Sequence, residues 1–200
     1  MPTKKRGKKF SLANEYKESW KYVKESKIFI YFAIAIFVFF LALGFFVPAP
    51  QPIYDQIMNY INGLLTQTKD LSQFQLITFI ISNNVQNTFL SIALGIVLGI
   101  FPIINTMING YMLGFVSLMS VNNGGLITLW KLFPHGIFEL PAVFISLGLG
   151  LKMGVFIFKK EKLKTFKNYA VNSFRVFLLI VIPLLIIAGI IEGTVIALIK

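Results

Sequence analysis

Hydrophobic and polar residues follow one another in long blocks along this chain. The first apolar block, residues 28–47 (IFIYFAIAIFVFFLALGFFV), is long enough to cross the ~30 Å hydrocarbon core of a bilayer as a helix. It ends at VPAPQP, where three prolines forbid helix continuation. The block is too long for the apolar part of a cleaved signal peptide, so it predicts a retained membrane span.

Four later blocks predict the remaining spans. Residues 74–104 are apolar except for SNNVQN, and their length predicts a kinked or two-part helix with Asn83, Asn84 and Asn87 near the outer boundary. Residues 109–121 are short for a span and predict a tilted or half-crossing helix. Pro134 opens a long helix to about Phe158, and the last span covers 174–199. The fold predicted is an all-α, polytopic membrane bundle with about five crossing helices.

Two other segments predict helices that lie on the membrane surface. Between Ser11 and Lys27, apolar residues recur at helical spacing among Lys and Glu; they are Leu12, Tyr16, Trp20 and Val23. Residues 53–65 trace one apolar face of an external helix, and a second helix is expected from about Leu71. We therefore divide the chain into a basic amphipathic segment, 1–27, and one transmembrane domain, 28–200, with an external helical segment at 48–82.

Composition supports the membrane class, and the placement of charge orients the chain. The 200 residues are 56% hydrophobic, with a mean hydropathy of +0.75 and a net charge of +11. Of the 19 Lys and Arg, nine precede residue 28 and six lie between 159 and 175. Such clusters stay in the cytoplasm beside the anionic inner leaflet. The prediction is a multi-pass plasma-membrane protein with a cytoplasmic N-terminus, an outside C-terminus and no nucleic-acid partner. The chain has no cysteine, which excludes disulfides and thiolate sites.

Glycine pairs four residues apart predict close helix packing, because small residues let helix backbones approach each other in lipid. The pairs are Gly95 and Gly99, Gly110 and Gly114, Gly150 and Gly154, and Gly189 and Gly193, and Gly136 is a further packing candidate.

Glu139 and Glu192 are the two acids that fall within apolar helices. His135, the single histidine, precedes Glu139 by one helical turn and shares its face. Three interpretations stay open for this group. The residues form a satisfied polar cluster with amides such as Asn84 or Asn109, they line a proton or cation path, or His135, Glu139 and Glu192 bind a metal such as zinc. The chain has no HExxH, GxSxG or glycine-rich phosphate loop.

Several stretches together resemble the stage II sporulation protein M family; they are KYVKESKIFI, NNVQNTFLSIALGIVLG, INGYMLG, FPHGIFELPAVFISLGLGLKMG and IAGIIEG. The most specific is PHGIFELPA, which is similar to the family's His-Gly and Glu-Leu signature. The resemblance implies that these are family positions: Asn84, Gly95, Gly99, Asn109, Gly110, His135, Gly136, Glu139, Glu192 and Gly193. It also implies a membrane partner of peptidoglycan-degrading proteins during engulfment, the family's founding role.

The functional prediction is a non-enzymatic scaffold that recruits membrane or envelope proteins, because no catalytic set is complete. A small transporter or channel for ions or lipid is the alternative, and an intramembrane metalloenzyme ranks third. No cofactor is expected, a divalent metal is the alternative, and a homo-oligomer is left open.

Overall fold

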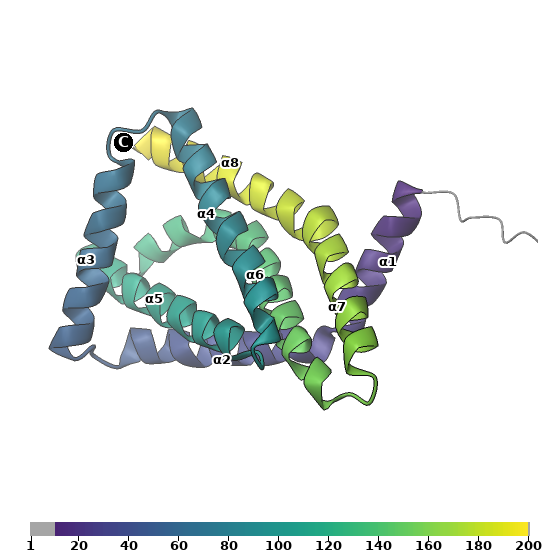
Figure 1. The fold of residues 1–200 in the computed structure, drawn as a ribbon. Coiled ribbons are helices and arrows are strands. Elements are labelled where there is room, and N and C mark those ends of the chain that lie inside the picture. Colours follow the sequence, from purple (N-terminus) through teal and green to yellow (C-terminus); the bar gives the residue numbers. More distant parts are fainter. Residues whose placement is uncertain (1–10, 200) are drawn as a thin grey trace, which may run out of the picture.

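The computed structural model describes the backbone of residues 11–199 and the side chains of 11–129 and 136–198 (Figure 1). The described part is 91% helical and has no strand, which confirms the all-α prediction. The α-helices are α1 (Leu12–Glu25), α2 (Lys27–Phe46), α3 (Gln51–Thr68), α4 (Gln73–Ala93), α5 (Ile100–Gly124), α6 (Phe133–Gly154), α7 (Lys162–Val176) and α8 (Ile182–Ile199). Short 3-10 segments are η1 (Leu94–Ile96), η2 (Leu126–Leu132) and η3 (Val155–Phe158), and η4 (Phe177–Val181) is a π-helical segment.

Four helices in the described chain are long and apolar enough to cross a membrane: Lys27–Phe46, Ile100–Gly124, Gly136–Phe158 and Lys162–Leu198. The last of these joins α7, η4 and α8 into one continuous helix. A π-helical turn directly precedes Pro183, where the missing proline N–H leaves a carbonyl without its usual partner. The predicted count of about five crossings also included α4, which has 21 residues but carries the polar SNNVQN cluster.

Residues 74–104 belong to two helices, as the two-part prediction requires, and the break falls after the asparagines. Helix α4 runs unbroken from Gln73 to Ala93 and includes the SNNVQN segment. The chain reverses direction only at residues 94–99. Leu98 and Gly99 adopt left-handed backbone angles there, with φ of 55° and 70°. Residues 109–121 consequently belong to the long helix α5, which has 25 residues and is not a short half-crossing helix. Asparagine side chains in a membrane helix left the backbone hydrogen bonds intact.

Local signals set where α3 and α4 begin. Pro52 lies in the first turn of α3, where its missing N–H costs no helical hydrogen bond. Ser72 caps α4 with a capping box, in which Ser72 Oγ accepts from the Gln75 amide and Gln75 Oε1 accepts from the Ser72 amide at 3.0 Å.

Helix α6 lies at the centre of the bundle and packs against α2, α4 and α8, while α2 and α5 pack along each other (Figure 1). Helices α1 and α7 lie together at one end. Helix α3 stands apart, and no other described helix packs along its length. The end of α3, the start of α4 and the end of α8 meet at one corner.

Glycines lie where these helices approach most closely. In α5, a Cβ on Gly110 or Gly114 would overlap the backbone of α2 at Phe37 or Leu41. A Cβ on Gly95 would overlap the backbone of Gly150, and one on Gly154 would overlap that of Gly99.

The remaining glycines predicted to pack differ in how closely neighbouring atoms approach them. A Cβ on Gly189 or Gly193 would press on Ile81 or Ile77 of α4. Among the described side chains, one on Gly136 would meet only that of Leu140, at 3.7 Å. Gly44 and Gly148 lie at equally tight contacts but are not part of the predicted pairs.

Candidate functional site

A network of half-buried amides joins α4 to α5. Asn105 Nδ2 donates to Asn87 Oδ1 at 3.0 Å and to Ser91 Oγ at 2.7 Å. Asn109 Nδ2 donates to Asn105 Oδ1 and to the Asn105 carbonyl, both at 2.8 Å. Both donor hydrogens of each amide are thus engaged within the bundle. Asn109, predicted as a partner of Glu139, takes part in this network, which we call the asparagine seam.

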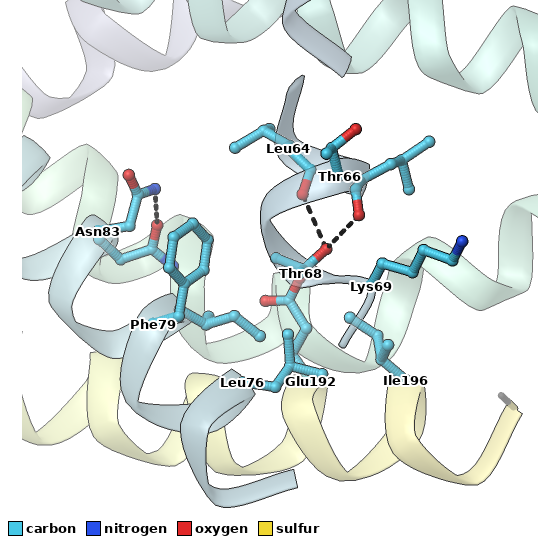
Figure 2. A pocket seen from close by; sticks show the side chains of 12 residues that line it. Leu64, Thr66, Thr68, Lys69, Leu76, Phe79, Asn83, Glu192 and Ile196 are labelled. Atoms are coloured by element: carbon cyan, nitrogen blue, oxygen red, sulfur yellow. Dashed lines mark hydrogen bonds between the residues drawn. The ribbon is translucent and has the colours of Figure 1, made fainter. Parts of the chain in front are cut away.

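Asn84 and Glu192, two other residues of the predicted cluster, line one cavity of about 640 Å³ between α3, α4 and α8. Its walls are mostly aliphatic and aromatic. The polar residues that line it are Thr66, Thr68, Lys69, Asn83, Asn84 and Glu192. Figure 2 shows the Glu192 carboxyl group pointing away from α8 toward the last turn of α3, where Thr68 lies. We call this space the Glu192 cavity.

The asparagines of the Glu192 cavity are loosely tied. Asn83 Nδ2 lies 3.5 Å from Asn84 Oδ1, at the limit of hydrogen bonding (Figure 2). Thr68 Oγ1 donates at 2.8 Å to the Leu64 carbonyl, one turn back in its own helix. Asn83 and Asn84 are therefore held less firmly than the amides of the asparagine seam.

Glu139 is half-buried in the first half of α6. His135 is in the first turn of the same helix, and its side chain lies outside the described residues. The proposed metal set of His135, Glu139 and Glu192 therefore cannot be assembled from described side chains. Among those that are described, no group of three His, Cys, Asp or Glu could hold a metal ion.

A second charged group inside the bundle was missed by the sequence reasoning. Lys152, near the end of α6, is only 6% exposed. Its Nζ donates to Ser26 Oγ at 2.9 Å and lies 3.8 Å from the centre of the Tyr22 ring and 5.3 Å from that of Tyr169. A desolvated ammonium over aromatic faces is a cation–π arrangement, and we call this group the Lys152 cage. Its signal in the sequence is a single lysine in the apolar run LGLGLKMG.

The Lys152 cage fastens the amphipathic helix to the bundle. Ser26, the residue between α1 and α2, is fully buried and donates to the Tyr22 carbonyl at 2.7 Å. Burial raises the pKa of the Tyr22 phenol above its ordinary value of about 10. Farther along α1, Glu15 forms an ion pair of 2.6 Å with Arg175 of α7.

Comparison with known proteins identifies the group to which this architecture belongs. Residues 33–195 match the family described as Stage II sporulation protein M. The chain belongs to the stage II sporulation protein M family. The match includes α3 to α7 and most of α2 and α8, so the resemblance seen in the sequence is confirmed. It covers the asparagine seam, Lys152 and the Glu192 cavity except for Ile196, but not Tyr22 or Ser26.

Two similar relatives come from Methanocaldococcus jannaschii. Uncharacterized protein MJ0793 is 35% identical over 120 residues, which cover 56% of this chain and 66% of the relative, just under two thirds of its length. Uncharacterized protein MJ0706 is 27% identical over 181 residues, 85% of this chain and 78% of the relative. No solved structure matches the chain.

Proposed function

We propose that this chain is a non-enzymatic scaffold that organises membrane or envelope proteins. The observation that supports it is the asparagine seam, because Asn105 and Asn109 direct their amide donors to acceptors inside the bundle. Half-buried amides whose donors are satisfied within the bundle favour one packing arrangement, whereas a transport path needs groups that exchange partners with a solute. The close glycine contacts between helices also make the bundle rigid. A rigid bundle is suited to holding other membrane proteins in fixed positions.

The proposed site of action is the plasma membrane, with the N-terminus in the cytoplasm and the C-terminus outside. Support comes from the Glu15–Arg175 ion pair, since it brings the two basic segments, 1–27 and 159–175, to the same end of the bundle. At that end both segments can meet an anionic inner leaflet.

The orientation has a direct test, because the chain has no cysteine background. Single cysteines at Gln67 and Thr165 should react with a membrane-impermeant maleimide from opposite sides of intact cells or right-side-out vesicles. Labelling of both from the same side would contradict the orientation.

The scaffold itself is tested by photo-crosslinking in cells. Tyr60 on α3 and Val38 on α2 are almost equally exposed, at 56% and 55%, so they form a matched pair. A photoreactive residue at position 60 should give discrete protein adducts, while one at position 38, on a membrane span, should give lipid adducts only. A homo-oligomer would give an adduct of twice the chain mass. Absence of any protein adduct at position 60 and at other exposed α3 positions would contradict a scaffold that acts through this helix.

A small transporter or channel is the second candidate, and the Glu192 cavity is the observation that favours it. A half-buried carboxyl group beside an open space of about 640 Å³ can meet a solute. Reconstituted vesicles separate the two functions: the scaffold predicts ion flux equal to that of empty vesicles. Flux that is lost in Glu192→Gln and kept in Asp55→Asn, an exposed carboxylate on α3, would replace the scaffold by a transporter.

A further inference from the structure

The Glu192 cavity has the size and lining of a ligand site. Its volume of about 640 Å³ lies within the ~300–1,000 Å³ range of small-molecule sites. The side chains that make it apolar are Leu64, Leu65, Leu76, Phe79, Ile80 and Ile196. Such walls match a hydrocarbon chain better than a hydrated ion. The occupant they favour is an amphiphile.

The polar groups of the cavity define the other end of that amphiphile. Glu192 brings a carboxyl group into the space, and the side-chain carbonyls of Asn83 and Asn84 add neutral acceptors. An ionised carboxylate in this setting is costly unless a cation or several donors accompany it. A primary ammonium meets this need, because it carries a positive charge and three hydrogen-bond donors.

The position of the cavity points to a lipid headgroup as the source of the ammonium. It lies at the corner where α3 ends, α4 begins and α8 ends, beside the polar turn at residues 69–72 (Figure 1). Ends of spanning helices and polar turns lie at headgroup depth in a bilayer. Helix α3, which covers the cavity, is mostly exposed and is not packed along any described helix, so a lipid can reach the space from the side.

The charges fit a zwitterionic lipid. Lys69 lines the same cavity and is the single basic residue between Pro48 and Asn84. Figure 2 shows its side chain extending away from Glu192. In a headgroup with a phosphate and a primary ammonium, the phosphate would face Lys69 and the ammonium would face Glu192.

We propose that the Glu192 cavity binds one phospholipid with a primary-ammonium headgroup, holding the ammonium at Glu192 and one acyl chain along the apolar walls. This site is independent of the scaffold proposal, because lipid binding is measured on the purified chain and needs no protein partner.

Native mass spectrometry of the full chain in detergent tests the site. The probes are phosphatidylethanolamine, its N-methyl and N,N-dimethyl forms, phosphatidylcholine and phosphatidylglycerol, all with the same acyl chains. Each methyl group removes a donor while the positive charge stays. Retention should fall along the methylated series and be roughly tenfold weaker for phosphatidylcholine, which keeps no donor for Glu192, since one charged hydrogen bond is worth about one decade in affinity. Equal retention of all five lipids, or preference for phosphatidylglycerol, would overturn the proposal.

Variants locate the binding in the cavity. Glu192→Gln should lose the preference for the primary ammonium, while Asp55→Asn, which changes an exposed carboxylate elsewhere on α3, should keep it. Leu64→Trp, at a half-buried position in the cavity wall, should weaken binding of every lipid in the set. A preference that survives in Glu192→Gln, or a copurified polypeptide displaced by Leu64→Trp, would overturn it. The methylation series uses the unmodified chain, so the proposal remains testable if a variant fails to fold.

Discussion

Lys152 and Glu192 both carry an ionisable group inside an apolar helix, but the fold surrounds them differently. Lys152 is enclosed: Ser26 accepts its hydrogen bond at 2.9 Å, and the Tyr22 ring lies 3.8 Å away. Glu192 instead faces a cavity of about 640 Å³ lined mainly by aliphatic side chains. The Lys152 cage holds a charge whose partners are all part of the protein. The Glu192 cavity leaves room for a partner from outside.

This difference follows from what packs at each end. At the Lys152 cage, α1, α6 and α7 meet around buried Ser26, and close glycine contacts hold α6 against α4 nearby. At the Glu192 cavity, α3 stands off from the bundle. Dense packing supplies fixed partners for a charge, whereas a loosely attached helix leaves space beside it.

The largest effect should come from disturbing the tight packing near Lys152. Gly150→Leu would drive a side chain into the Ser91 carbonyl and the Pro102 ring, so we expect loss of monodisperse protein in detergent. Gly136→Leu, in the same helix but against only one flexible side chain, should stay within about 1 kcal/mol of the unmodified protein. Size-exclusion profiles and thermal midpoints measure both. Equal behaviour of the two variants would mean that the two regions do not differ in packing.

The next largest effect concerns the aromatic face over Lys152. Tyr22→Leu removes the ring while keeping an apolar side chain, and should destabilise the protein by about 2 kcal/mol, as expected for a desolvated cation–π contact. Tyr22→Phe keeps the ring, and the buried hydroxyl that it removes has no hydrogen-bond partner among the described residues. It should therefore be nearly neutral. Thermal unfolding in detergent compares the pair, and a similar loss in both would assign the effect to the hydroxyl.

A smaller effect should appear at alkaline pH. Burial raises the pKa of Tyr22, so below pH 10 the phenol is protonated in both folded and unfolded states and adds no pH dependence. Above pH 10 the unfolded state ionises first. The free energy of unfolding should then fall by up to about 1.4 kcal/mol per pH unit until the folded-state pKa is passed.

The Tyr22→Phe variant isolates this term from the other alkaline titrations. Its stability difference from the unmodified protein, measured from pH 8 to 11.5, should be flat up to pH 10 and change above it. A difference that stays constant across the range would show that Tyr22 is not buried in solution.

The smallest effect should come from Glu192 itself. Because its carboxyl group faces open space, Glu192→Gln should change the thermal midpoint of lipid-free protein very little, by less than about 0.5 kcal/mol of unfolding free energy. A loss of several kcal/mol would mean that the carboxylate has fixed partners, and the contrast with Lys152 would disappear.

Much of the fold could be read from local sequence. The apolar blocks predicted the helical membrane class, because only a helix satisfies its own backbone over a stretch of that length in lipid. Pro52, Ser72 and Gly99 lie where α3 begins, α4 begins and the α4–α5 reversal ends. The two-part helix over residues 74–104 was predicted correctly, but the sequence did not show where it breaks. The side chain of Asn87 bonds to Asn105 of α5 and leaves the α4 backbone helical, so the break falls at residues 94–99.

The residues that each polar side chain contacts on other helices could not be predicted from the local sequence. Helical spacing fixes that Asn105 and Asn109 share a face, but it does not say that this face meets Asn87 and Ser91. It likewise gave no reason to join Lys152 to Tyr22, which is 130 positions earlier in the chain.

The sequence alone therefore determined the helical membrane class, most helix boundaries and the family, because length, prolines, caps and motif order act locally. The tertiary structure decided which polar groups are enclosed and which face a cavity. The physical reason is that lipid and a protein interior are almost equally apolar, so hydrophobicity does not choose the rotation of a helix about its axis. Close glycine contacts and side-chain hydrogen bonds between helices make that choice, and they exist only once the helices have met.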